Sequence, residues 1–137
     1  MPNRATGSFD VKLTPQSLAD ANADPTLGRM SIDKQYHGDV EAVAKGEMLT
    51  GMTAIKGSAG YVAMERVTGS VHGRKGSFTL QHNGTMKRGA QHLTIAVVPD
   101  SGTDQLSGLE GELSIRITDG KHFYEFEYSV PDAKKAP

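Results

Sequence analysis

The sequence predicts an all-β fold, a closed antiparallel barrel of about eight strands. Two observations support this prediction. First, one passage occurs twice: residues 68–80 and 103–115 match without a gap in a threonine, an aliphatic residue, two glycines and two large apolar residues. Glycine adopts positive φ without steric cost, so each copy predicts a tight bend followed by a strand. Second, apolar and polar residues alternate between turn residues along the chain, and no helix of normal length is indicated. A two-sheet sandwich remains the alternative, because alternation alone does not separate the two folds.

The first half of the chain contains four expected strands. Pro15 is expected to end the first strand, and the polar stretch 16–24 is expected to form one helical turn before Pro25. His37-Gly38-Asp39 predicts a turn, and Gly46 predicts a bulge or a close approach of two backbones. The four expected strands cover residues 9–13, 27–36, 40–50 and 61–67.

The second half adds four more strands. Asp119-Gly120 predicts a tight hairpin between the last two. The strands expected at 61–67 and 91–98 are apolar on both faces, which indicates that something covers the outside of the barrel. We therefore expect a homodimer or a larger homo-oligomer. The four expected strands cover residues 77–82, 91–98, 112–118 and 121–130.

Composition limits the classes of function. The 137 residues are expected to form one domain over 1–130, followed by a disordered tail over 131–137. The chain has no cysteine and a net charge of −1 with interleaved charges, so neither a thiolate nucleophile nor a nucleic-acid partner is expected. The basic pairs Arg74-Lys75 and Lys87-Arg88 are interpreted as solvated loop tips. No apolar run is long enough to span a bilayer, so we expect a cytoplasmic protein without a membrane partner.

Two stretches carry a resemblance to a known family. Phe78-Thr-Leu-Gln-His82 and Val97-Val-Pro-Asp-Ser-Gly-Thr103 resemble an uncharacterised bacterial family filed as a domain of unknown function (DUF3224-type). The resemblance extends over nearly the whole chain. It implies a barrel similar in fold to allene oxide cyclase and the calycins, and it implies an oligomer. It implies no activity and no catalytic residue.

Glu65 and His82 are the candidate catalytic residues. Glu65 shares a strand face with Tyr61, so burial in apolar surroundings is expected to raise its pKa and suit it to acid–base chemistry. The alternative is a structural carboxylate paired with Arg66 or with another cation across the sheet. His82 and Gln81 lie on opposite faces of one strand. Whichever of them faces the lumen is the candidate acid–base or hydrogen-bonding group there, and a satisfied surface histidine is the alternative for His82.

Three aromatic residues are candidate ligand contacts, Tyr61, Tyr124 and Phe126. Tyr124 and Phe126 belong to one face of the last strand, which is expected to be buried. That face could wall a pocket, with the Tyr124 hydroxyl available for a hydrogen bond, or it could be ordinary core packing.

No metal or cofactor is expected, since the five histidines lack ligand spacing and no nucleotide-binding fingerprint occurs. Three functions stay open. The first is a barrel that binds a small hydrophobic molecule in its lumen. The second is a cyclase or isomerase on the same barrel, which needs a polar group inside. The third is a structural or assembly protein with a filled lumen.

Overall fold

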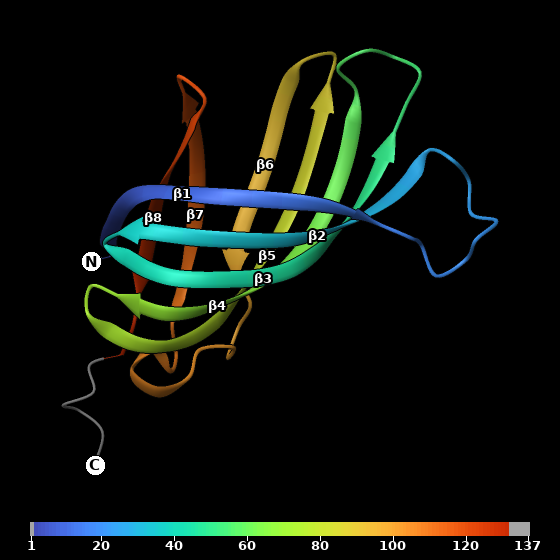
Figure 1. Cartoon of the computed structure of the whole chain (residues 1–137). Coiled ribbons are helices and arrows are strands. Elements are labelled where there is room, and N and C mark those ends of the chain that lie inside the picture. The colour runs from blue at the N-terminus through green and yellow to red at the C-terminus, as the bar shows by residue number, and fades with distance from the viewer. Residues whose placement is uncertain (1, 132–137) are drawn as a thin grey trace.

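The computed structural model describes residues 2–131 and shows a closed antiparallel barrel of eight strands (Figure 1). Each strand pairs with its neighbour in sequence, and β1 closes the barrel by pairing with β8. The predicted barrel is confirmed, and the sandwich is excluded. Most of the predicted tail, residues 132–137, lies outside the described residues. The strands are β1 (Asn3–Gln16), β2 (Leu27–Gly38), β3 (Val40–Met52), β4 (Ala59–Val71), β5 (Arg74–Lys87), β6 (Ala90–Val97), β7 (Glu110–Thr118) and β8 (Lys121–Ser129).

Most strands are longer than their apolar patterns indicated. Pro15 does not end β1, which continues to Gln16. Pro15 lies opposite Met30 near the end of the strand, where a missing backbone N–H is tolerated. The expected helical turn after it is wrong. In its place, the Asp20 and Asp24 side chains accept hydrogen bonds from the backbone N–H groups of Asn22 and Thr26, which fold the β1–β2 connection into turns.

The two copies of the repeated passage share one conformational feature and differ in another. Gly73 and Gly108 both have φ of +80°, as the shared bend requires. The first copy begins as the end of β4, whereas the second contains a short 3₁₀ helix, η1 (Asp104–Leu106). This loop covers one end of the barrel, where Leu106 and Leu109 are fully buried.

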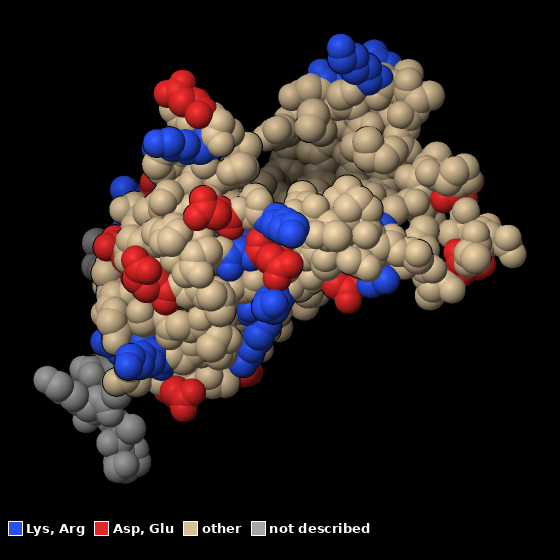
Figure 2. All heavy atoms as spheres, in the orientation of Figure 1, with Lys and Arg blue, Asp and Glu red and all other residues tan. Residues whose placement is uncertain are grey.

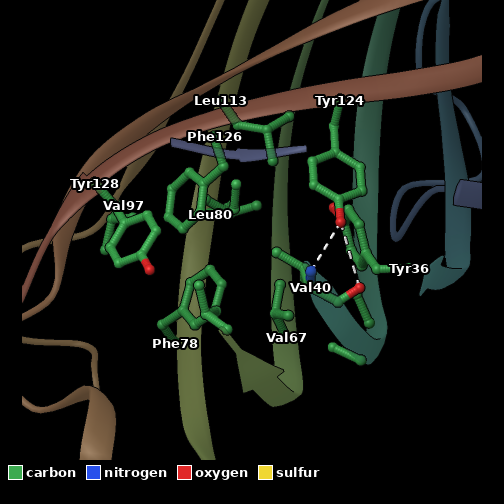
Figure 3. Packing of buried hydrophobic residues seen from close by; sticks show 14 of the residues in the cluster. Tyr36, Val40, Val67, Phe78, Leu80, Val97, Leu113, Tyr124, Phe126 and Tyr128 are labelled. Carbon is green, nitrogen blue, oxygen red and sulfur yellow. Dashed lines mark hydrogen bonds between the residues drawn. The ribbon is translucent and has the colours of Figure 1, made fainter. Parts of the chain in front are cut away.

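The end of the barrel covered by η1 is filled with side chains. The rings of Phe78 and Phe126 stack at a centroid distance of 5.8 Å. The Tyr124 hydroxyl accepts a hydrogen bond from the Val40 N–H at 2.8 Å (Figure 3). It also donates to the His37 carbonyl at 2.9 Å. These bonds attach β8 to the β2–β3 turn. This half of the lumen is therefore core rather than cavity.

Gly46 allows β3 and β4 to approach closely where the filled half ends. It lies on the inner face of β3, directly opposite Glu65 on β4. A Cβ at this position would collide with the backbone carbonyl of Met64. The close approach predicted at Gly46 is thereby confirmed.

Candidate functional site

The other half of the barrel is hollow. Its cavity has a volume of about 650 Å³ and opens between the hairpin tips that lie away from η1 (Figure 2). β6 and β7 share a single paired position, Ala96 with Glu112, so the barrel closes most weakly between these two strands. The large apolar side chains that line the cavity are Phe9, Val11, Leu13, Ile32, Met48, Met52, Met86, Leu93, Ile115 and Ile117.

A buried network of polar groups forms the floor of this cavity. The Glu65 carboxylate oxygen Oε1 accepts hydrogen bonds from Lys34 Nζ at 3.0 Å, from the Tyr36 hydroxyl at 2.9 Å and from His82 Nε2 at 2.8 Å. Lys34 and His82 also line the cavity, whereas Glu65 lies beneath them. The Lys34 ammonium lies 4.8 Å from the centre of the Phe9 ring, a cation–π contact that further stabilises its charge. The floor is therefore polar although it lies inside the barrel.

Glu65 is held as a carboxylate. Burial acts to raise its pKa, but the hydrogen bond from His82 and the charge of Lys34 outweigh burial, so its pKa is lowered from the ordinary value of 4.5. The expectation of a raised pKa is therefore wrong. The paired-carboxylate alternative describes the environment, with Lys34 as the cation across the sheet. Arg66 points elsewhere, donating to Thr79 and to the Ser101 carbonyl.

His82 links the carboxylate to the cavity. Because a carboxylate only accepts hydrogen bonds, the network assigns the proton to His82 Nε2. In the neutral imidazole, Nδ1 then accepts a hydrogen bond from the Tyr61 hydroxyl, whose oxygen lies 3.2 Å away. Burial and the nearby charge of Glu65 raise the pKa of Tyr61, so its phenol stays protonated. Tyr61, His82 and Glu65 form one hydrogen-bonded chain from the cavity into its buried floor.

Tyr36 is the third hydrogen-bond donor to Glu65, and it is buried beneath the cavity floor. Burial, followed by the charge of Glu65, raises its pKa well above 10.0, so it remains a hydrogen-bond donor. The second carboxylate oxygen of Glu65, Oε2, is buried without a hydrogen-bond partner among the described residues. The three donors on Oε1 therefore carry the stabilisation of this buried charge.

The structure brings together three of the predicted site residues, Glu65, His82 and Tyr61. Gln81 lies exposed on the outer face of β5, so the alternative in which it faced the lumen is wrong. Phe78 and Leu80, which share the face of His82, are buried inside.

Tyr124 and Phe126 do not wall the cavity. Both belong to the buried cluster in the filled half (Figure 3), so the core-packing alternative describes them. Sequence reasoning missed Lys34 and Tyr36. A signal for Lys34 was present, since it shares a strand face with Ile32 and Tyr36, and a lysine on an apolar inner face needs a buried partner.

No group of three or more histidine or acidic side chains within residues 2–131 is arranged to hold a metal ion. Across the same residues, no helix is long and apolar enough to cross a membrane.

Comparison with known proteins identifies relatives without an assigned activity. The family model described as a protein of unknown function (DUF3224) matches residues 5–128. A crystal structure of a DUF3224-family protein of unknown function from Shewanella oneidensis MR-1 is 49% identical, with a TM-score of 0.91. The match covers 97% of this chain and 100% of that one. Among curated proteins, none matches significantly. The likeness to allene oxide cyclase stays a prediction.

Proposed function

The chain belongs to the DUF3224 family, whose function is unknown, and we propose that its barrel binds a small hydrophobic molecule in the open half of the lumen. The supporting observation is the cavity of about 650 Å³, whose apolar walls lead down to a polar floor. Ligand pockets typically have this size and this combination of apolar walls with a few placed polar groups. A wholly filled lumen, as the structural alternative requires, is inconsistent with this cavity.

The floor favours a ligand with one hydrogen-bonding oxygen. The Lys34 ammonium has three N–H donors, of which one bonds Glu65 and another makes a long contact of 3.4 Å to Tyr36. The remaining N–H can donate a hydrogen bond to a ligand oxygen, because Lys34 lines the cavity. The formal charges of Lys34 and Glu65 cancel, so an added carboxylate would be buried without a counter-charge of its own. We therefore assign the polar group to a hydroxyl or carbonyl.

The test is a titration with N-phenyl-1-naphthylamine, a neutral hydrophobic molecule that fluoresces in apolar surroundings. Ile115 points into the cavity, and its neighbour Ser114 points out of the barrel from the same strand. We expect Ile115→Trp to fill the cavity and weaken probe binding at least tenfold, with Ser114→Trp as the matched control. Equal affinity of both variants, or absence of probe binding to the unmodified protein, would contradict the proposal.

The hydrogen-bonded chain of Tyr61, His82 and Glu65 supports a second candidate function, an isomerase or cyclase on the same barrel. The protonated Tyr61 hydroxyl could turn its single proton from His82 Nδ1 to a carbonyl oxygen in the cavity as negative charge develops on that oxygen. Under this proposal, Tyr61→Phe lowers kcat for an identified substrate about 100-fold and leaves probe affinity within a few-fold. Unchanged turnover in Tyr61→Phe would remove this candidate.

A further inference from the structure

Two hairpin tips at the mouth of the cavity are joined into one platform. The Gly89 N–H donates to the Gly57 carbonyl at 2.9 Å, and the Arg88 N–H donates to the Ser58 hydroxyl at 2.9 Å. These bonds connect the β3–β4 loop with the β5–β6 turn. We call residues 52–58 and 86–93 the tip platform.

The tip platform is basic. Lys56, Lys87 and Arg88 are all exposed on it, and neither of its two segments contains an aspartate or glutamate. Figure 2 shows lysine and arginine atoms gathered at the top of the tip platform. The chain as a whole has a net charge of −1, so the positive charge is a local feature. By contrast, the β1–β2 connection on the same rim carries Asp20 and Asp24.

Large apolar side chains lie beside these cations. Met52, Ile55 and Leu93 are 58%, 51% and 40% exposed. Met52 and Leu93 also line the cavity. Met52 and Leu93 therefore belong both to the wall of the cavity and to the exposed tip platform.

We propose that the tip platform docks on an anionic lipid bilayer, from which the hydrophobic ligand enters the cavity. Exposed cations are attracted to anionic headgroups, while adjacent apolar side chains insert into the boundary of the acyl region. The charge of the platform is complementary to such a surface, and hydrophobic molecules concentrate in bilayers. This inference rests on the proposed function, because the docking positions the mouth of the ligand cavity.

This proposal differs from the expectation of no membrane partner, which was drawn from the sequence alone. Lys56 and Lys87-Arg88 lie about thirty residues apart in the sequence, where Lys87-Arg88 is interpreted as a solvated loop tip. The pairing of β4 with β5, in which Ala59 lies opposite Met86, and the hydrogen bonds between the two tips bring these cations onto one platform.

The test is cosedimentation with vesicles made from equal parts of phosphatidylcholine and phosphatidylglycerol, compared with phosphatidylcholine alone. Each cation near an anionic surface contributes about fivefold to partitioning, so Lys87→Gln/Arg88→Gln should weaken binding to the anionic vesicles about 25-fold. The matched control is Arg74→Gln/Lys75→Gln, a basic pair at the opposite end of β5. We expect the control to bind like the unmodified protein, and Ile55→Ser to bind more weakly.

Three results would overturn the docking proposal: no binding to anionic vesicles, equal loss in both double variants, or binding of a single-stranded oligonucleotide in place of vesicles. Titration with N-phenyl-1-naphthylamine in the absence of vesicles separates this proposal from the proposed function. Lys87→Gln/Arg88→Gln should keep its affinity for the probe. Probe binding without vesicle binding overturns docking alone, whereas vesicle binding without probe binding overturns the ligand-binding function alone.

Discussion

Lys34 and Glu65 form an ion pair inside the barrel, with Nζ and Oε1 separated by 3.0 Å and both side chains almost inaccessible to solvent. The two residues come from β2 and β4, which β3 separates. The pair spans the lumen side of three strands at the level where the filled half meets the cavity. The same ion pair therefore contributes to the stability of the barrel and forms part of the cavity floor.

Breaking this pair should destabilise the protein strongly. Lys34→Met leaves Glu65 as a buried charge without its cation, and Glu65→Gln leaves Lys34 without its anion. Each single change is expected to lower the free energy of unfolding by about 3–5 kcal/mol. The double variant should lose much less than the sum, because no uncompensated charge remains. Urea denaturation of the four proteins measures this coupling, and additive losses would show that the pair is energetically unimportant.

The lowered pKa of Glu65 predicts a stability that depends on pH. A carboxyl group whose pKa is lower in the folded state stabilises the fold at pH values above its unfolded pKa. This contribution is lost as pH falls below about 4.5 and through the folded-state pKa. The difference in unfolding free energy between the unmodified protein and Glu65→Gln should therefore shrink on acidification. A difference that stays constant from neutral pH to pH about 3 would contradict the assigned protonation state.

Gly46 should not tolerate a side chain. In Gly46→Ala, the new methyl group would meet the backbone of Met64 and Glu65, so we expect a loss of about 1–3 kcal/mol in the free energy of unfolding. Gly51→Ala is the control in the same strand, since its nearest neighbouring atom is 4.0 Å from the added carbon. Thermal and urea unfolding should place the control within about 0.5 kcal/mol of the unmodified protein. Equal effects at both positions would mean that β3 and β4 do not need this close approach.

The outer face of β3 and β4 carries apolar side chains that are about half exposed, namely Val43, Leu49, Val62 and Met64. Leu49 and Val62 lie directly opposite each other in the sheet. We propose that a second copy of the chain covers this face, as the apolar pattern of β4 indicated. Light scattering should give at least twice the chain mass of 14.6 kDa. Val62→Lys should reduce the mass to that of a monomer, whereas Ser114→Lys on β7 should not, and a monomeric unmodified protein would contradict the proposal.

The sequence predicted the barrel well for a physical reason. Alternation reports which face of each strand is buried, and paired glycines report where the chain must bend; Gly73 and Gly108 both have the left-handed φ that the repeated passage indicated. The strand ends were predicted less well. At positions such as Asn3–Gly7, pairing with β8 rather than local apolar pattern determines that the chain is extended.

The candidate site was predicted only in part. Glu65 and Tyr61 share a strand face, so their proximity could be inferred from β4 alone. Lys34 could not be matched with Glu65, because 31 residues separate them and the match requires the register of two strand pairs. The boundary between the filled half and the cavity depends on the packing of Tyr124 and Phe126 with their neighbours, which no local pattern specifies.

Native mass spectrometry of the purified protein tests the central claim most directly, before and after incubation with excess N-phenyl-1-naphthylamine. We predict one small organic molecule bound per chain, retained by Ser114→Trp and lost from Ile115→Trp. A spectrum that shows only the bare chain under both conditions, or equal occupancy in Ile115→Trp, would contradict a ligand-binding barrel.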